Sequence, residues 1–286
     1  MIFAPLDIHL LLKKYDIIPN KRLGQNFLID PHILDRIVDA ADIDPNKTVL
    51  EIGPGLGSLT RILAQYAACI LAVEIDQRMI SPLQDILAEY PAVHIIQGDI
   101  LKVNINELIN LYSPRDSSGY LVVANIPYYI TSALIRNLLE LAQPPLRIIL
   151  TIQVEVAERI CAQPGKMNLL ALSVQVYGQP QIITKIPADA FFPIPRVDSA
   201  VVRVDSYTSP LIPPENIKLF FRLAKAGFSQ KRKTLRNTLS AGMHWDTRTA
   251  ENILRGVNID PMRRAETLNL DEWKTLTLFV DNIDEE

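Results

Sequence analysis

The chain has 286 residues, of which 48% are hydrophobic, and its formal net charge at pH 7 is −3. This length accommodates one sizeable α/β domain and a smaller second domain, and the apolar fraction supplies a full core. The net acidity taken alone argues against a nucleic-acid-binding protein.

The sequence lacks the signals of secretion, membrane anchoring and metal binding. Residues 1–15 carry neither a basic leader nor a long apolar run. Cys69 and Cys161 each lie in an apolar segment without the spacing of a metal or redox pair, so we expect both in the core. The four histidines have no metal-ligand spacing. We therefore expect a cytoplasmic protein with no membrane anchor and no metal.

The first helix is predicted to begin at Pro31, with Asp30 as its cap. Its apolar stripe consists of Ile33, Leu34, Ile37 and Val38. The preceding segment, residues 23–30, is too short and mixed in character to form a strand of its own.

A buried strand, a tight turn and a helix are predicted between Thr48 and Tyr66. The turn contains Gly53, Gly55 and Gly57, whose missing Cβ atoms let a ligand lie against the N–H groups of a helix start. The spacing is one residue shorter than the G-x-G-x-x-G of dinucleotide sites. A tight turn without a ligand is therefore the alternative.

Three further predicted strands end in polar side chains, at the strand ends where open α/β sheets bind ligands. Glu74 lies about 20 residues after the glycines, the distance at which an acid reaches ribose hydroxyls. Asp76 could instead cap the helix predicted over residues 77–90. The three runs are residues 69–76 with Glu74 and Asp76, 93–99 with Asp99, and 120–128 with Asn125 and Tyr128.

An ordered set of motifs runs almost from end to end of the chain. The motifs are Lys21–Asp30, Leu50–Gly57, Val73–Asp76, Gly98-Asp99, Asn125–Tyr128, Phe191–Val201, Phe228–Asn237 and Arg264–Glu266. Together they resemble the S-adenosylmethionine-dependent ribosomal RNA adenine dimethyltransferases of the KsgA or RsmA family. The resemblance implies an α/β fold, with a Rossmann-like class I methyltransferase sheet and a smaller C-terminal all-helical domain. One departure is Asn168-Leu-Leu-Ala171, where the family often has a Tyr-Gly pair.

The resemblance also implies which residues bind the cofactor, S-adenosyl-L-methionine. Glu74 would bind the ribose diol, Asp99 the exocyclic amine of the adenine, and the Gly53 backbone the methionine part. From sequence alone, Asn26 is equally well explained as a turn residue. The implied cofactor residues are Asn26, Leu28, Gly53, Glu74, Asp99 and Asn125.

The segment Asn125–Tyr128 suits methyl transfer to an adenine. The N6 amine is a poor nucleophile, but the Asn125 side-chain oxygen and the Ile126 carbonyl can accept its two hydrogens and aim its lone pair at the methyl group. Pro127 stiffens the backbone, and Tyr128 can stack on the ring. Phe191, in a stiff proline-containing loop, is expected to supply the second face of an aromatic clamp. An Asn–Pro turn with a core Tyr is the alternative.

Later segments complete the predicted sheet and add a helical domain. Residues 147–153 are predicted to form a fifth strand, and residues 181–186 and 199–204 a closing pair. A proline-rich linker begins at residue 207. We therefore predict a methyltransferase domain with an N-terminal RNA-contacting extension over residues 1–206, and a helical RNA-binding domain over residues 207–286.

A basic run without any acid contradicts the impression given by the net charge. It contains Lys218, Arg222, Lys225, Lys231, Arg232, Lys233 and Arg236. Since phosphate binding is local and screened, this distribution matters more than the sum. An ordinary solvated helix surface is the alternative.

The predicted function is dimethylation of N6 of two adjacent adenosines in the hairpin near the 3′ end of small-subunit (16S) rRNA. We expect the partners to be that rRNA and the immature small ribosomal subunit, and the protein to be a monomer. One rival is an antibiotic-resistance methyltransferase acting on large-subunit rRNA, and another is a mainly non-catalytic ribosome-assembly checkpoint factor. A nicotinamide oxidoreductase is disfavoured by the short glycine turn and by Asn125–Tyr128.

Overall fold

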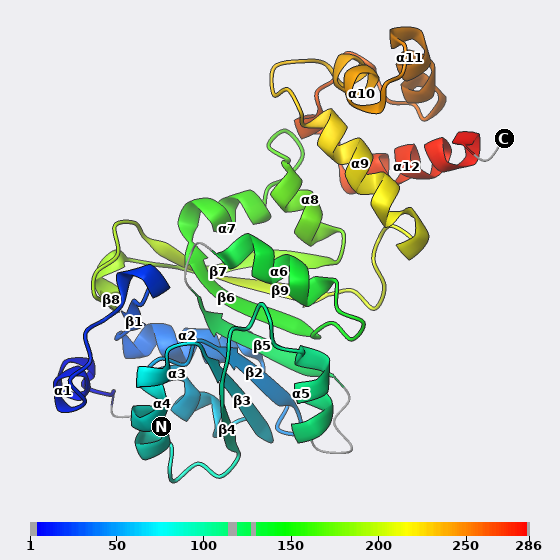
Figure 1. Cartoon of the computed structure of the whole chain (residues 1–286). Coiled ribbons are helices and arrows are strands. Elements are labelled where there is room, and N and C mark those ends of the chain that lie inside the picture. Colours follow the sequence, from blue (N-terminus) through cyan, green and yellow to red (C-terminus); the bar gives the residue numbers. More distant parts are fainter. Residues whose placement is uncertain (1–4, 114–118, 127–129, 285–286) are drawn as a thin grey trace. The chain divides into compact units, whose positions relative to one another are not determined.

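The computed structural model describes residues 5–113, 119–126 and 130–284, and it divides into two units (Figure 1). The sheet unit comprises Met1–Ala157 and Pro180–Ser206, and the helical unit comprises Glu158–Gln179 and Tyr207–Glu286. The division after Ser206 lies where the linker was predicted. Segment 158–179 was predicted in the first domain but belongs to the second.

Hydrogen bonds explain why segment 158–179 joins the helical unit. The backbone N–H groups of Gly165 and Met167 both donate to the carbonyl of Glu266, at 2.7 and 3.1 Å. The N–H of Tyr207 donates to the carbonyl of Tyr177 at 2.8 Å. These partners are distant in sequence, so local patterns did not reveal them.

Among the described residues, seven strands form one sheet in the order β4-β3-β2-β5-β6-β9-β7 (Figure 1). Each pair of neighbours from β4 to β6 is parallel, and β9 is antiparallel to β6. The strands are β2 (Thr48–Ile52), β3 (Cys69–Glu74), β4 (Val93–Gln97), β5 (Tyr120–Asn125), β6 (Arg147–Gln153), β7 (Gly178–Ile186) and β9 (Ser199–Ser206).

The strand register places one apolar set of side chains on each face of the sheet. Val49 pairs with Ile70 on one side and Leu121 on the other, so these three side chains share a face. They pack in one core cluster with α2 (Pro31–Ala41) and α3 (Ser58–Leu63). Strands covered on both faces need apolar residues at successive positions, which is why the central strands are nearly continuous apolar runs.

A second, two-stranded sheet was not expected from the sequence. In it, β1 (Phe27–Leu28) pairs antiparallel with β8 (Phe191–Phe192). The pairing brings Leu28 opposite Phe191. It ties the N-terminal segment to the loop that precedes β9.

The order of the parallel strands reverses between β2 and β5. From β2 the chain proceeds outward through β3 to β4, and it then returns to place β5 on the other side of β2. Ligands of open α/β sheets bind outside the carboxyl ends of the strands at such a reversal. Gly53 follows β2 and Asn125 ends β5, so both lie at this point.

The helical unit contains α9 (Ile217–Gly227), α10 (Leu235–Met243), α11 (Thr247–Gly256) and α12 (Leu270–Asp284). In it, α9 packs against α10 and α12, and α10 packs against α11. Gly242 of α10 permits one of these close approaches, because a Cβ there would lie 2.4 Å from the Cβ of Ala226. The remaining α-helices are α1 (Ile8–Lys14), α4 (Gln77–Ile86), α5 (Ile105–Tyr112), α6 (Thr131–Leu139), α7 (Val154–Ile160) and α8 (Leu169–Gln175).

The described residues bear on two expectations, one about membrane-spanning helices and one about the burial of the two cysteines. None of the helices there combines the length and the apolar character needed to cross a membrane. Cys69 is buried as expected, whereas Cys161 is only partly buried.

Candidate functional site

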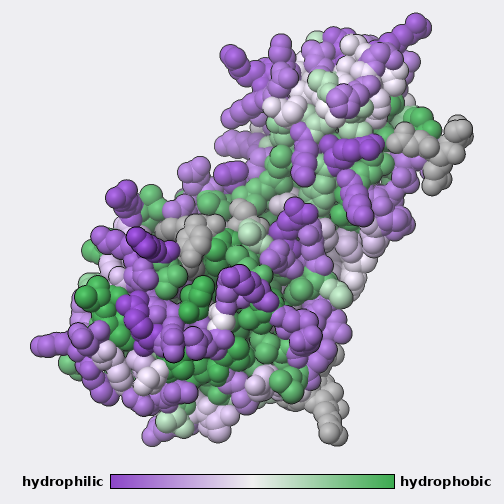
Figure 2. Space-filling model, in the orientation of Figure 1, coloured by the Kyte–Doolittle hydropathy of each residue, from purple (hydrophilic) through white to green (hydrophobic). Residues whose placement is uncertain are grey.

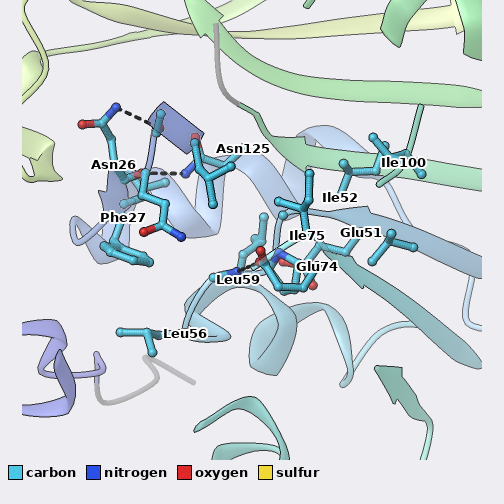
Figure 3. Close-up of a pocket in the computed structure, with 18 of the residues that line it drawn as sticks. Asn26, Phe27, Glu51, Ile52, Leu56, Leu59, Glu74, Ile75, Ile100 and Asn125 are labelled. Carbon is cyan, nitrogen blue, oxygen red and sulfur yellow. Dashed lines mark hydrogen bonds between the residues drawn. The ribbon is translucent and has the colours of Figure 1, made fainter. Parts of the chain in front are cut away.

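A cavity lies at the carboxyl ends of β2, β3, β4 and β5 in the sheet unit (Figure 3). It encloses about 1020 Å³, including the space open to solvent at its mouth. The cavity wall includes all six residues predicted to bind the cofactor, namely Asn26, Leu28, Gly53, Glu74, Asp99 and Asn125.

The glycine turn is shaped by positive φ angles at Gly53 and Gly55 and by one close approach, at Gly55. Gly53 has φ +71°, and a Cβ there would lie 3.5 Å from the backbone oxygen of Asn125. Gly55 has φ +57°, and a Cβ there would lie 2.9 Å from the ring of Phe27. Both positions therefore need glycine for the turn itself, and both also line the cavity. The turn and the ligand hypotheses are thus compatible.

Glu74 lies at the end of β3 with only 4% of its surface exposed. One carboxylate oxygen accepts from the N–H of Gly55 at 3.1 Å, and the other accepts from the N–H of Asp76 at 2.8 Å. Burial raises the pKa of Glu74 above its usual value, and these N–H groups oppose the rise. A carboxylate has about four acceptor sites, so Glu74 retains capacity for two hydroxyl donors.

Asp76 caps α4, which was the alternative considered for it. Its carboxylate accepts from the N–H of Arg78 at 3.1 Å and forms an ion pair with the Arg78 guanidinium at 2.5 Å. These contacts with Arg78 hold the pKa of Asp76 below its usual value. Asp76 is 6% exposed and does not line the cavity.

Glu51 is a site residue that the sequence reasoning missed. It lies in β2, is 2% exposed and lines the cavity. Its Oε2 atom has no hydrogen-bond partner among the described residues. Burial raises its pKa to about 8, and the nearby Glu74 carboxylate adds to the rise. A carboxylate between Leu50 and Ile52, inside an otherwise apolar strand, was the available signal.

Asn125 and Asn26, which both line the cavity, are joined by a hydrogen bond (Figure 3). The Asn125 side-chain Nδ2 donates to the backbone carbonyl of Asn26 at 3.1 Å. This bond orients the Asn125 amide, so its oxygen is left to accept hydrogens from a ligand. The Asn26 side chain donates to the carbonyl of Gly24 at 3.2 Å, so Asn26 is a turn residue as well as a wall residue.

The remaining part of the predicted catalytic segment is only partly described. The side chain of Ile126 is 3% exposed. Pro127 and Tyr128 lie outside the described residues. The stacking predicted for Tyr128 therefore stays a prediction.

Asp99 and two isoleucines form the end of the cavity near β4. The Asp99 carboxylate accepts from the N–H of Leu101 at 3.1 Å and pairs with Lys102 at 3.5 Å. Ile75 and Ile100 line the same cavity. Apolar side chains beside an acceptor suit a flat heterocycle that carries an amine.

The structure does not bring Phe191 to the cavity wall. Its side chain is 1% exposed and belongs to the core cluster that includes Leu28, its partner across the β1–β8 pair. The pairing directs Phe191 into the core, and its expected role as the second face of an aromatic clamp stays a prediction. The neighbouring Phe192 is partly buried, and Ile194 is 66% exposed.

The basic run of the helical unit is mostly on the surface. Lys218, Arg222 and Lys225 are exposed on α9, whose Phe220, Leu223 and Ala224 are buried. In Figure 2, hydrophilic side chains project from the visible face of the helical unit. The exposed members are Lys218, Arg222, Lys225, Lys231, Arg232 and Lys233. Arg236 is instead partly buried and paired with Glu251 at 3.1 Å.

Comparison with known families gives one match that covers most of the chain. The family described as "Ribosomal RNA adenine dimethylase" matches residues 19–276. A protein of Dehalococcoides mccartyi (strain CBDB1) named "Ribosomal RNA small subunit methyltransferase A" is 42% identical over 268 residues, which are 94% of this chain and 90% of that protein.

Two solved structures are similar along most of their length. A dimethyladenosine transferase from Plasmodium falciparum has a TM-score of 0.77 and 27% identity, covering 90% of this chain and 98% of that one. The 23S rRNA methyltransferase ErmE has a TM-score of 0.73 and 25% identity, covering 90% of this chain and 100% of that one.

Proposed function

Because the chain belongs to the ribosomal RNA adenine dimethylase family, we propose that it dimethylates N6 of two adjacent adenosines near the 3′ end of small-subunit rRNA. It is an rRNA adenine dimethyltransferase, and its methyl donor is S-adenosylmethionine. The choice of the small subunit is supported by the relative named for that subunit, whose identity extends over 94% of this chain.

The observation that carries the proposal is the single cavity wall shared by Asn125, Glu74 and Asp99. We assign Glu74 to the ribose hydroxyls, because its buried carboxylate retains acceptor capacity beyond its two N–H contacts. We assign Asp99 to the adenine amine, between Ile75 and Ile100. The residues therefore fit the cofactor, with carboxylate acceptors for its hydroxyls and amine and apolar walls for its ring. Leu28, Asn26 and the Gly53 backbone complete the wall.

Methyl transfer to N6 needs positioning more than it needs a base. When bound, the cofactor supplies a methyl group on a positively charged sulfur, which is a good leaving group. The Asn125 amide oxygen and the Ile126 carbonyl would accept hydrogen bonds from the two amine hydrogens, which would turn the nitrogen lone pair toward the methyl group. As the new N–C bond forms and the C–S bond breaks, one proton of the amine would leave to water. The bond from Asn125 Nδ2 to Asn26 fixes the amide in the required orientation. Pro127 and Tyr128 are proposed to stiffen this segment and to stack on the base.

Contact with RNA is proposed for two basic surfaces. One is the exposed set on the helical unit, whose lysines and arginines would neutralise phosphates. The other is the exposed pair Lys21 and Arg22, ahead of the cavity-lining segment. We further propose that the protein acts in the cytoplasm as a monomer on immature small subunits.

A methylation assay on purified subunits tests the proposal. The purified protein is incubated with labelled S-adenosylmethionine and either small or large ribosomal subunits that lack the modification. We expect label in small-subunit rRNA as N6,N6-dimethyladenosine. Label in large-subunit rRNA alone would refute the assignment in favour of the resistance-type activity.

The assembly role is tested separately in cells. If small-subunit assembly defects in cells lacking the protein are rescued by a catalytically inactive variant, then binding is the dominant role. If only the active protein rescues them, methylation itself is required.

A further inference from the structure

Gln25 lines the cavity, yet the proposed function gives it no part. Its side-chain Nε2 donates to the Asp76 carboxylate at 2.8 Å, across 51 positions of sequence. Its side-chain oxygen accepts from the N–H of Asn20 at 2.7 Å, and its own N–H donates to the Asn20 carbonyl at 3.3 Å. Gln25 therefore closes the turn over residues 20–25 and fastens it to the β3–α4 corner.

The far end of this link reaches the proposed ribose acceptor. Asp76 donates its backbone N–H to Glu74 Oε1 at 2.8 Å, and Glu74 Oε2 accepts from Gly55 at 3.1 Å. One continuous set of hydrogen bonds thus runs from Asn20 through Gln25, Asp76 and Glu74 to the glycine turn. Both carboxylates in it are at most 6% exposed, and Asn20 and Gln25 are partly buried.

Further contacts hold the same segment on both sides of the cavity. Arg78, which is paired with Asp76, donates to the carbonyl of Ile18 at 3.3 Å. Asn125 donates to the carbonyl of Asn26 at 3.1 Å. Residues 18–26 therefore span the cavity between the strand end that carries Glu74 and the strand end that carries Asn125.

We propose that Gln25 is a positioning residue: it holds this segment against Asp76 and thereby fixes the wall formed by residues 23–26 relative to Glu74. Asp76 and Arg78 are the anchor. The inference rests on the proposed cofactor site, because its expected consequence is tighter binding of S-adenosylmethionine. Gln25 acts through Asp76 and does not itself need to touch the cofactor.

The first experiment compares Gln25→Ala with a matched control, Gln84→Ala, an exposed position on α4. For Gln25→Ala we expect the Kd for S-adenosylmethionine to rise about tenfold, the scale of one hydrogen bond to a charged group, with kcat at saturating cofactor within about threefold. Gln84→Ala should match the wild type. Isothermal titration calorimetry and steady-state kinetics give the two quantities.

A second measurement needs no cofactor. Lys21 and Arg22 lie inside the turn that Gln25 closes, so trypsin should cut there faster in ligand-free Gln25→Ala than in the wild type. Cleavage after Lys102, an exposed site elsewhere in the sheet unit, serves as the internal reference. Mass spectrometry of the early fragments reports both sites.

A reversal of the hydrogen bond separates positioning from general damage. Gln25→Glu should place two carboxylates face to face, and Asp76→Asn should place two amide donors face to face. In the double variant, the amide introduced at position 76 can donate to the carboxylate introduced at position 25, and an asparagine side chain remains a good helix cap. We therefore expect each single variant to bind cofactor weakly and the double variant to regain most of the affinity.

The outcomes distinguish the inference from the function on which it rests. Wild-type cofactor affinity and wild-type cleavage in Gln25→Ala would overturn the inference, as would a double variant no better than the worse single one. If the wild type itself fails to bind S-adenosylmethionine, the proposed function fails. The cleavage comparison in the ligand-free protein still decides whether Gln25 holds the segment.

Discussion

The sheet unit keeps Glu74, at the cavity wall, and the nearby Asp76 buried and hydrogen-bonded, whereas the helical unit displays most of its basic run to solvent. Glu74 and Asp76 have at most 6% of their surface exposed, and each oxygen of both has a partner. Lys218, Arg222 and Lys225 are exposed along one helix. Ligand binding in the first region should depend on the geometry of oriented groups, and RNA binding at the second should depend on local charge.

The two regions should therefore respond differently to substitution. A buried, oriented group is hard to replace, because its neighbours are left unpaired or misplaced. An exposed cation contributes a screened, roughly additive attraction to phosphate. We expect large, salt-insensitive losses at the cavity and small, salt-dependent losses on the helical surface.

The largest effect is expected for Asn125→Ala. Removing the amide deletes one proposed acceptor for the N6 hydrogens and the bond that ties Asn26 to β5. We expect methylation of small subunits to fall by about 1000-fold or to be abolished, the scale of lost positioning. Asn46→Ala, in an exposed turn, is the control. Unchanged turnover in Asn125→Ala would refute the catalytic assignment.

Glu74→Gln should weaken cofactor binding by about 100-fold, because an amide offers one acceptor where the carboxylate offers two. The pH dependence sharpens this. Burial raises the Glu74 pKa above its ordinary value of 4.5. The ionised form is the proposed acceptor of the ribose hydroxyls. Wild-type affinity should therefore fall as pH drops through that raised pKa.

Calorimetric titrations of S-adenosylmethionine at several pH values measure both effects. The Glu74→Gln variant should lack the step attributed to Glu74. A variant that keeps the wild-type affinity, or the same pH profile, contradicts the ribose assignment.

Glu51→Gln should stabilise the fold in alkaline solution. The Glu51 pKa is raised from 4.5 to about 8, so between these values the native state binds more protons than the unfolded state. The free energy of unfolding therefore falls as pH rises through this window, and it falls less in the variant. We expect a gain on the order of 2 kcal/mol at pH 8, reduced by the cost of burying an amide.

Urea denaturation at pH 4.5 and pH 8 checks the prediction for Glu51. Relative to the wild type, the free energy of unfolding of the variant should be higher at pH 8 than at pH 4.5. An equal difference at both pH values would mean that Glu51 does not titrate in this window.

The smallest effects are expected on the helical surface. Each of Lys218→Ala, Arg222→Ala and Lys225→Ala should weaken small-subunit binding only a few-fold, and the triple variant should reduce the slope of log K against log salt by about 2–3. Cofactor affinity should not change. Lys166→Ala, exposed in the same unit, is the control. Loss of RNA binding without any change in salt slope would contradict the phosphate-contact role.

Much of the sheet could be predicted because its strands are locally coded. The runs at Thr48, Cys69 and Tyr120 are apolar and end in glycine or polar residues, and each forms a parallel strand. The helix predicted over residues 77–90 begins as expected but ends at Ile86. The two-residue strand β1 was missed because its existence depends on pairing with β8.

Site residues could be predicted where they belong to a recognisable sequence motif. They could not be predicted where their position depends on packing between residues distant in sequence. The six cofactor residues that the family resemblance implied share one cavity wall. Phe191 turned inward because of its pairing with Leu28, which no local pattern encodes. The Gln25–Asp76 bond joins residues 51 positions apart and was likewise invisible. Glu51 left a signal, a lone acid inside an apolar strand, that was not used.

The most direct test of the account measures N6,N6-dimethyladenosine in small-subunit rRNA by mass spectrometry. The RNA comes from cells that lack the protein and carry either the wild-type gene, the Asn125→Ala variant or an empty vector. The account predicts the modified nucleoside only with the wild-type gene. Its presence with the empty vector, or its full return with Asn125→Ala, would contradict the account.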